Sequence, residues 1–465
     1  MDFLQLGAHA VPRRGRVVWL ADRLRAAIAS GELVPGVRLP ASRVLAEELS
    51  LSRGTVVEAY RRLGEEGLLV ANRGGGTVVG TAVPAPAPTR EPGLGASSEV
   101  LDVSVGMPDL SAFPRAAWLS AERRVLATAS WRELGYADPR GVPALRVALA
   151  GWLARSRGVV ADPDQIVVTA GVTGALSLLA QVLTARGITA CAVEDPGADG
   201  NRRILDYWLD RLHPVRVDEH GLVVADLFRT GARAVLVTPA HQFPTGVVLS
   251  PARRRELVAW AHDTDGLVIE DDYDAEYRYD RTPVRALQAM APERVVHVSS
   301  LSKVLAPALR IGWTVAPAAW CDDLARRRWA TDLGSPALPQ LALADLVESG
   351  ALERQLRSLR LRHRDRRDAA VAAVRRHLPG CEIDGVAAGL HLVVRLPEHV
   401  DDTDLAARAR AEGIAVQPLS RHRATPGPPG LVLGYGPHPP STMEQAIAVI
   451  ASLVETSTRQ PAADG

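Results

Sequence analysis

The sequence of 465 residues is poor in cysteine and lysine, and it has no apolar run long enough to cross a membrane. A membrane span needs about 18 or more consecutive apolar residues, and the first residues lack the apolar stretch of a signal peptide. The three cysteines lie far apart, which argues against a disulfide framework or a zinc module and favours a reducing cytoplasm. The net charge of +1 argues against a polycation, so any contact with nucleic acid has to come from a local basic patch.

Lysine is almost absent. Of the 54 basic residues, 53 are arginine and one, Lys303, is lysine. A coding preference for arginine explains the 53. Arginine replaces lysine as a surface charge, but its guanidinium stays protonated and cannot serve as an imine-forming amine. The single lysine therefore indicates that position 303 needs the chemistry of an amine.

Two dissimilar parts follow one another along the chain. Residues 81–99 are rich in proline, alanine, glycine and serine, which predicts a semi-rigid polyproline linker. We expect one domain over residues 1–80 and a second over 100–455, with a smaller C-terminal α/β subdomain from about residue 380. Residues 456–465 form a short tail.

The first part has the pattern of a winged helix-turn-helix, a mostly α-helical fold. Apolar residues at helical spacing predict helices over residues 17–30, 41–49 and 53–66. Two short strands, 68–71 and 77–79, flank a glycine-rich turn and form the wing.

The third predicted helix carries side chains suited to DNA. Residues 1–80 hold 11 arginines against eight acidic residues, a modest positive excess. The first residues of such a helix reach base edges in the major groove, and arginine binds guanine through two hydrogen bonds. The stretch GELVPGVRLPASRVLAEELSLSRGTVVEAYRRLGEEGLL resembles the N-terminal domain of GntR-family bacterial repressors. By this resemblance the DNA contacts are Arg43, Ser52, Arg53 and Thr55, with Gly76 and Thr77 in the wing. A winged helix that binds a protein instead of DNA is the alternative.

The second part alternates strands and helices, which predicts a mainly parallel α/β sheet. Strand-like segments are 165–169, 190–194, 234–238, 267–270 and 295–299. Residues 336–378 are expected to be helical, and the remainder mixes strands and helices.

Three motifs of the second part fit one ligand. Lys303 follows a predicted strand, another strand ends in three acids before Tyr273, and small residues from 171 to 174 join a strand to a helix. Buried acids need a cation or a hydrogen-bond donor, and free amides at a helix N-terminus can hold a phosphate. Pyridoxal 5′-phosphate needs an amine, a carboxylate opposite its pyridinium nitrogen, and an anion cradle.

We therefore predict pyridoxal 5′-phosphate as the cofactor. Lys303 supplies the amine, Asp271 faces the pyridinium nitrogen, and Tyr273 donates to the phenolate oxygen. The predicted phosphate ligands are the amides of Gly171, Val172 and Thr173 and the side chains of Ser300 and Arg310.

The second part resembles a fold-type I aminotransferase, and more narrowly the C-terminal half of MocR-subfamily regulators. The stretches that carry the resemblance are SVGMPDLSAFPR, LGYADPRGVPALR, VEDPG, TPAHQFPTG, IEDDYDAEYRY and SSLSKVLAPALRIGW. The resemblance implies a homodimer in which Tyr136 reaches the cofactor phosphate of the partner subunit. It also implies that Gln242 lies beside the cofactor ring.

Two positions depart from the pattern of the subfamily. Ala198 follows VEDPG, where an aromatic residue normally lies near the ring. Val432 stands where amino-acid-binding members carry an arginine for the substrate carboxylate, and valine cannot form that bidentate contact. Arg421 and Arg423 are nearby candidates for its replacement. The histidines show no metal-ligand spacing, so no metal site is expected.

The sequence thus predicts a cytoplasmic transcriptional regulator that responds to pyridoxal 5′-phosphate or an adduct of it. A homodimer is expected to bind a DNA operator with two half-sites, without contact to a membrane, and to control vitamin B6 or amino-acid metabolism. Two alternatives stay open. One is an active aminotransferase that carries a DNA-binding domain, against which Val432 argues. The other is a dimerisation scaffold with a decayed pocket, against which Lys303 and Asp271 argue.

Overall fold

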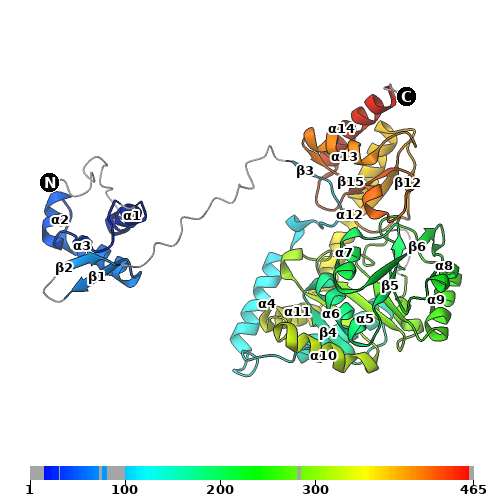
Figure 1. Ribbon diagram of the computed structural model, residues 1–465, viewed down its shortest axis with the longest axis horizontal. Helices are drawn as coiled ribbons and strands as arrows, with labels where there is room; N and C mark the ends of the chain where they lie inside the picture. The colour runs from blue at the N-terminus through cyan, green and yellow to red at the C-terminus, as the bar shows by residue number, and fades with distance from the viewer. Residues whose placement is uncertain (1–14, 31, 73–75, 81–99, 280–283, 460–465) are drawn as a thin grey trace. The chain divides into compact units, whose positions relative to one another are not determined.

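The computed structural model describes residues 15–30, 32–72, 76–80, 100–279 and 284–459. The chain divides into two compact units, Met1–Ser97 and Ser98–Gly465, which are described separately (Figure 1). The predicted linker, residues 81–99, and most of the predicted tail, residues 460–465, lie outside the described residues. Within the described ranges, no helix is both long and apolar enough to span a bilayer.

The first unit is a winged helix-turn-helix. Its elements are the helices α1 (Arg16–Ala29), α2 (Ser42–Glu48) and α3 (Arg53–Glu65) and the antiparallel strands β1 (Leu69–Asn72) and β2 (Gly76–Val79). Each helix contributes one apolar face to a common core, in which Leu20, Leu45 and Leu63 are fully buried. Because short helices are unstable alone in water, this shared core is what holds the three helices in place.

The large subdomain of the second unit is built on an eight-stranded sheet in the order β4-β11-β10-β9-β8-β5-β6-β7. The strands are β4 (Ile166–Thr169), β5 (Ala190–Asp195), β6 (Arg211–Asp218), β7 (Gly221–Leu222), β8 (Ala234–Val237), β9 (Leu267–Asp271), β10 (Val295–Ser300) and β11 (Gly312–Val315). The neighbours from β10 through β9, β8 and β5 to β6 run parallel, whereas the pairs made by β11 and β7 are antiparallel. The mainly parallel sheet is confirmed, although β6, β7 and β11 were not predicted.

Helices cover both faces of this sheet (Figure 1). They are α4 (Arg115–Thr128), α5 (Pro143–Arg157), α6 (Gly171–Ala185), α7 (Asp199–Trp208), α8 (Val224–Thr230), α9 (Pro251–Asp263), α10 (Ala318–Asp332) and α11 (Ala337–Glu348). Successive strand residues enter opposite cores: Val167 and Ile269 pack with α6, whereas Val168 packs with α5 and Val268 with α9. A strand covered on both faces has to be apolar throughout, which explains the continuous apolar runs of the sequence.

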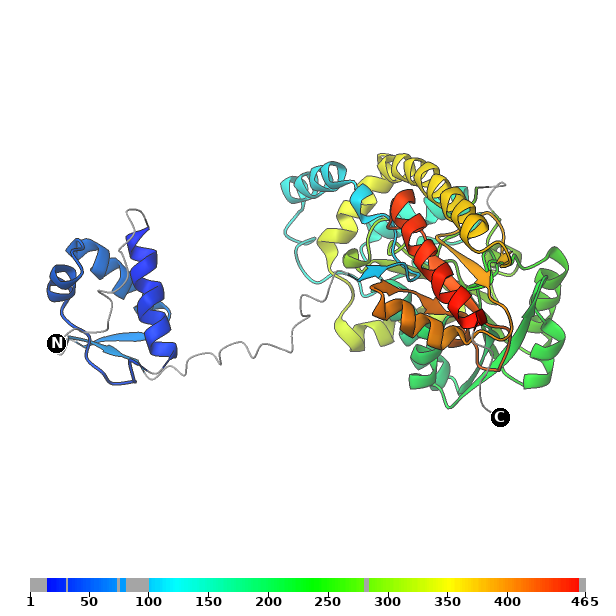
Figure 2. The ribbon, with the colours of Figure 1, turned by 90° about the horizontal axis from the view of Figure 1, so that it is seen from above.

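The small subdomain is a four-stranded antiparallel sheet with helices on it. Its strand order is β12 (Ile383–Asp384), β13 (His391–Arg395), β16 (Gly430–Gly434) and β15 (Gln417–Pro418). Its helices are α12 (Ala351–His377), which packs against α14 (Pro440–Arg459), and α13 (Asp402–Ala411) (Figure 2).

The beginning of the second unit also belongs to the small subdomain. Strand β3 (Leu101–Asp102) pairs in parallel with β14 (Ile414–Ala415), and Val103 is buried in the core of this subdomain. The last turns of α12 enter the same core through Ala370 and Val374. The subdomain predicted from about residue 380 therefore takes in two earlier segments of the chain.

Candidate functional site

A cavity of about 480 Å³ lies where the carboxyl ends of the large-sheet strands meet the small subdomain. The large subdomain lines it with residues from α6, β9 and the segment after β10, and the small subdomain adds Gln417, Arg421 and His422. Open α/β sheets bind their ligands at this edge. The predicted cofactor residues that line the cavity are Val172, Thr173, Asp271, Tyr273, Ser300, Lys303 and Arg310.

Lys303 lies inside this cavity against the backbone of an early loop. Its Nζ donates a hydrogen bond to the carbonyl of Gly106. Gly106 has a φ of 109°, and a Cβ there would lie 3.2 Å from Nζ, so the loop needs glycine to pass this close. Burial lowers the pKa of the Lys303 ammonium, and the carboxylates of Asp271 and Asp274 oppose that lowering. A lowered pKa leaves more of the amine unprotonated and able to attack a carbonyl.

Two of the three acids that end β9 have structural partners. The Glu270 carboxylate accepts hydrogen bonds from the backbone amides of Leu287 at 2.7 Å and Gln288 at 3.0 Å. The Asp272 carboxylate pairs with the buried guanidinium of Arg157, with 2.6 Å between Oδ2 and Nε. Both acids are therefore satisfied by the protein itself, and neither needs a ligand.

Asp271 is the acid left incompletely paired. Its Oδ2 accepts a hydrogen bond of 2.8 Å from the side-chain amide of Asn201, but its buried Oδ1 has no hydrogen-bond partner within the described part of the chain. Burial raises the pKa of Asp271 to about 7, the Asn201 contact opposes this, and Asp272 and Asp274 add to it. A buried carboxylate oxygen without a donor is costly, so this atom fits the N–H of a pyridinium ring.

The predicted phosphate cradle is assembled at the start of α6. No side chain caps this helix at Ala170, so its first amides are free for a ligand. Gly171 has a φ of 75°, and a Cβ there would lie 3.5 Å from the guanidinium of Arg310. Arg310 is held by a hydrogen bond of 2.5 Å to the Ala170 carbonyl. Ser300 and Ser302 add hydroxyl groups, so amides, hydroxyls and one cation converge as a phosphate requires.

A histidine–aspartate pair, His241 and Asp274, lies next to the Tyr273 hydroxyl, and no pattern in the sequence predicted it. The Tyr273 hydroxyl lies 3.0 Å from Nδ1 of His241, which lies 3.1 Å from both carboxylate oxygens of Asp274. His241, Asp274 and His391 also bring potential metal ligands within 4.8 Å of one another. His391 already bonds the Pro244 carbonyl at 2.9 Å. The contacts of His241 place the His241–Asp274 pair where it can orient the Tyr273 hydroxyl.

Three predicted cofactor residues are not among those that line the cavity of this chain: Gly171, at the start of α6, Gln242 and Tyr136. The buried side-chain amide of Gln242 donates to the carbonyls of Pro196 at 2.8 Å and Phe243 at 2.7 Å, and its oxygen accepts from the backbone and hydroxyl of Thr245. Gln242 thus ties two loops together, and its neighbour Phe243 lines the cavity instead. Tyr136 is 91% exposed, as a residue offered to a second subunit has to be.

The positions that depart from the subfamily have clear structural surroundings. Ala198 lines the cavity, so this position offers a methyl group where the subfamily has an aromatic ring. Val432 is fully buried in an apolar cluster of the small subdomain, which leaves no place for a cation. Arg421 lines the cavity with its Nε 3.2 Å from Asp199, whereas Arg423 faces a different cavity. Of the two candidates for a carboxylate contact, Arg421 is thus the one that lines this cavity, together with the further cations Arg203 and Arg310.

The start of α3 presents the predicted DNA contacts to solvent. The Ser52 hydroxyl caps the helix by accepting a hydrogen bond of 3.1 Å from the amide of Thr55, and the two hydroxyls lie 2.8 Å apart. Arg43 and Arg53 are exposed, and neither has an ion-pair partner among the described residues. Arg61, farther along α3, is instead engaged by neighbouring glutamates. Arg53 lies at the first turn of α3, the end that reaches base edges in such domains, and Arg43 lies near the start of α2; their contact with DNA stays a prediction.

The wing is tied to the segment before α2. The amide of Leu39 donates to the Thr77 carbonyl at 2.9 Å, and the backbones of Arg38 and Val78 form an isolated antiparallel β-bridge. Gly76 has a φ of 83°, and the side chain of Arg38 lies over it, 3.7 Å from where a Cβ would stand. Arg38 is thus a further basic residue beside the wing. Its place in the G-x-R-L-P stretch was the signal for it.

Two family descriptions match the chain. Residues 19–79 match "Bacterial regulatory proteins, gntR family", and residues 98–450 match "Aminotransferase class I and II". Curated regulators are similar along nearly the whole chain. The HTH-type pyridoxine biosynthesis transcriptional regulator PdxR of Corynebacterium glutamicum is 36% identical over 444 residues, 94% of this chain and 95% of that protein. The probable rhizopine catabolism regulatory protein MocR of Rhizobium meliloti is 34% identical over 456 residues, 93% of this chain and 92% of that protein.

Solved aminotransferase structures share the fold of the second unit. An archaeal alanine:glyoxylate aminotransferase has a TM-score of 0.71 and 26% identity, over 77% of this chain and 91% of that protein. The multiple substrate aminotransferase of Thermococcus profundus has a TM-score of 0.72 and 25% identity, over 78% of this chain and 93% of that protein.

Proposed function

We propose a function on the premise that the chain belongs to the MocR-type transcriptional regulators, in which a GntR DNA-binding domain precedes an aminotransferase class I and II domain. It is a DNA-binding regulator, and the cofactor of its second domain is pyridoxal 5′-phosphate. In our proposal this domain senses the cofactor, or an adduct of it, and alters how the winged helices bind an operator. The observation that carries the proposal is the buried Oδ1 of Asp271, which has no partner among the described residues and belongs to the cavity that holds the only lysine of the sequence.

Bound pyridoxal 5′-phosphate supplies an aldehyde that bonds to an amine and a ring that withdraws electrons. Lys303 would supply the amine that attaches it. The Asp271 carboxylate would face the ring nitrogen, and pairing with a pyridinium would favour its ionised form against burial. The Tyr273 hydroxyl, which lies beside His241, would donate to the phenolate oxygen. The amides at the start of α6 and Arg310 would hold the phosphate.

Sensing is favoured over transamination by the missing carboxylate contact. An α-amino acid needs a cation for its carboxylate, and Val432 is buried among apolar side chains at the position where the subfamily has one. A sensor of the vitamer itself needs no such contact. Arg421 supports the second candidate, an active aminotransferase, because it lines the cavity and could meet a carboxylate if it left Asp199.

We propose a homodimer that binds two operator half-sites. Large apolar side chains stand exposed around the end of α4 and the end of α10: Leu126 at 64%, Trp131 at 77%, Tyr136 at 91% and Trp329 at 61%. Exposed apolar surface of this kind suits burial against a second copy. Tyr136 would then reach the cofactor of the partner. Similarity to the regulator of pyridoxine biosynthesis supports vitamin B6 genes as the target, and binding to bacterial DNA supports a cytoplasmic location.

The test combines the cofactor with the operator. Purified full-length protein is titrated with pyridoxal 5′-phosphate on operator fragments whose half-site spacing is varied, and Lys303→Ala serves as the control. We expect the cofactor to change the preferred spacing for the wild type only, because a ligand shifts an equilibrium only through different affinities for the two states. Equal affinity with and without cofactor at every spacing would refute the sensor. Bleaching of the cofactor absorbance by amino acids would favour the enzyme.

A further inference from the structure

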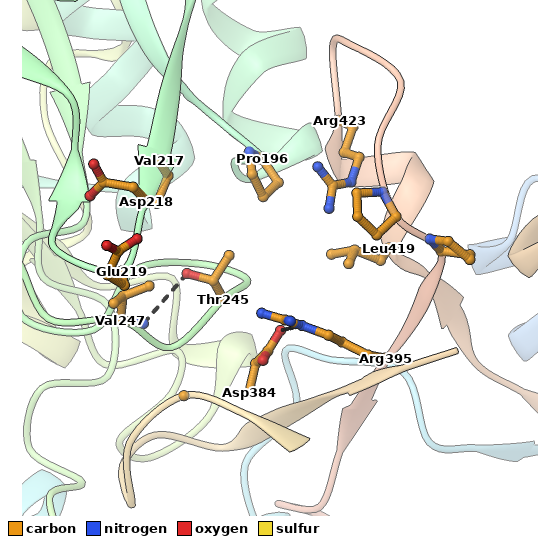
Figure 3. A pocket seen from close by; sticks show the side chains of 13 residues that line it. Pro196, Val217, Asp218, Glu219, Thr245, Val247, Asp384, Arg395, Leu419 and Arg423 are labelled. Carbon is orange, nitrogen blue, oxygen red and sulfur yellow. Dashed lines mark hydrogen bonds and ion pairs between the residues drawn. The ribbon is translucent and has the colours of Figure 1, made fainter. Parts of the chain in front are cut away.

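A second cavity, of about 430 Å³, lies between the large and small subdomains on the other side of the segment 419–423 (Figure 3). The large subdomain contributes Val217–Glu219 and Thr245, and the small subdomain contributes Arg395 and residues 419–429 in part. Its volume falls within the range of about 300–1,000 Å³ that is usual for small-molecule sites. Neither the DNA-binding nor the cofactor-binding role uses it.

Most charged groups around this cavity are already paired. Asp218 accepts from the guanidinium of Arg253 at 2.9 Å, and Arg395 donates to Asp384 at 2.7 Å. Within each of these two pairs the charges neutralise each other, so neither pair needs a charged ligand.

One cation and one anion are left over. The Arg423 guanidinium has no hydrogen-bond or ion-pair partner in the portion of the chain that the structure describes, and its Nε is buried. It lies against Gly427, where a Cβ would come within 2.3 Å of Nη1. The Glu219 carboxylate is likewise unpaired among the described side chains and stands on the opposite wall, as Figure 3 shows. The space between them therefore has one positive and one negative end.

Apart from Thr245 and Gly385, the rest of the lining is apolar. It comprises Pro196, Val217, Val247, Leu419, Pro428 and Pro429. We propose that this cavity binds a small zwitterion, an ammonium and a carboxylate joined by an apolar body, as in a free amino acid. Its carboxylate would bond to Arg423 and its ammonium to Glu219, and the apolar body would lie against the prolines and valines.

The segment 419–423 forms part of the wall of both this cavity and the cofactor cavity. Leu419 and Arg423 line the second cavity, whereas Arg421 and His422 line the first. The segment is fixed to the end of β5, because the amide of Gly197 donates to the His422 carbonyl at 2.8 Å.

A ligand held between Glu219 and Arg423 links the large subdomain to the small one. The cofactor cavity is closed by the same two subdomains, so the zwitterion is expected to tighten cofactor binding, and the cofactor to tighten zwitterion binding equally. This coupling rests on the proposed function, whereas the binding itself does not.

The first experiment measures binding by calorimetry to the full-length protein after the cofactor has been fixed with borohydride, which fills the cofactor cavity. The probes are L-leucine and 6-aminohexanoate, with 3-methylbutylamine and 4-methylpentanoate as singly charged analogues of leucine. We expect one or both zwitterions to bind and both analogues to bind at least about 10-fold more weakly, since each loses one charge-assisted contact. Absence of binding by both zwitterions would overturn the proposal.

Variants then locate the site. Arg423→Gln and Glu219→Gln should each weaken binding about 10- to 100-fold. Gly427→Ala, which pushes the guanidinium aside, should weaken it without removing a charge. Arg395→Gln is the matched control, because this arginine lines the same cavity but is paired, and it should change the affinity less than about twofold. An equal loss in the control, or a loss in Arg421→Gln but not in Arg423→Gln, would overturn the assignment.

The second experiment measures the coupling. The affinity of untreated protein for pyridoxal 5′-phosphate is compared with and without saturating zwitterion, and about fivefold tighter binding is expected. An unchanged affinity would overturn the coupling but not the site. If borohydride fixes no cofactor at all, the proposed function fails, and zwitterion binding to Lys303→Ala still tests the second cavity separately.

Discussion

Replacing Asp271 by asparagine should stabilise the cofactor-free protein while impairing cofactor binding. Burial raises the pKa of Asp271 from 3.8 to about 7. Between these values the folded protein keeps a proton that the unfolded chain has lost. The unfolding free energy therefore falls as the pH rises from about 4 to about 7 and then levels off. The asparagine side chain of the variant would not titrate and would keep an oxygen for the amide of Asn201.

The size of the effect follows from the two pKa values. Each unit of difference is worth about 1.4 kcal/mol, so the ionised carboxylate costs on the order of 4 kcal/mol above pH 7. At pH 5 the same relation leaves a cost of about 2 kcal/mol. The advantage of Asp271→Asn over the wild type should therefore grow by about 2–3 kcal/mol between pH 5 and pH 8. With the cofactor bound, the wild type should be the more stable of the two proteins, because only its carboxylate can pair with a pyridinium.

Urea denaturation followed by tryptophan fluorescence provides the assay. Eight of the nine tryptophans lie in Ser98–Gly465, so the signal reports the unit that contains the change. Asp206→Asn is the control, since it makes the same chemical change on a carboxylate of α7 that is exposed to solvent. A stability difference that does not grow with pH would refute the burial argument. Unchanged affinity of Asp271→Asn for the cofactor would show that Oδ1 does not face the ring nitrogen.

Three further substitutions test the remaining assignments. Lys303→Ala should abolish any borohydride-reducible adduct, because the chain has no second lysine, and recovery of an adduct would contradict the assignment. Arg53→Ala should weaken specific operator binding by about 1–3 kcal/mol in a gel-shift assay and relax preference at one base pair, whereas Arg61→Ala, whose charge neighbouring glutamates engage, should have little effect. If Arg53→Ala weakened binding to all DNA sequences equally, Arg53 would contact a phosphate and not a base. Tyr136→Phe should weaken cofactor binding in the dimer, and an unchanged dissociation constant in an absorbance titration would remove Tyr136 from the partner's site.

The order of the motifs along the chain was enough to predict the cofactor cavity, but not the environment of each residue. Lys303 and the strand-end acids are local signals, since both lie at strand ends that a parallel sheet brings to one edge. Gln242 belongs to an equally strong motif, yet its side chain ties loops together and Phe243 lines the cavity. Asn201 gave no signal at all, because its role arises only where α7 passes β9.

Apolar periodicity predicted the winged helix-turn-helix and the mainly parallel α/β sheet, and the presence of a single lysine marked Lys303 as the predicted imine-forming amine. These features depend on neighbours within a few residues, so a single sequence contains them. Only the tertiary structure decided which of three adjacent acids keeps a carboxylate oxygen without a donor among the described residues, because the partners of the other two come from distant segments. It also separated Arg421 from Arg423, two residues apart but in different cavities. Charge compensation acts through space, between groups that the fold brings together, and for this reason local patterns did not reveal it.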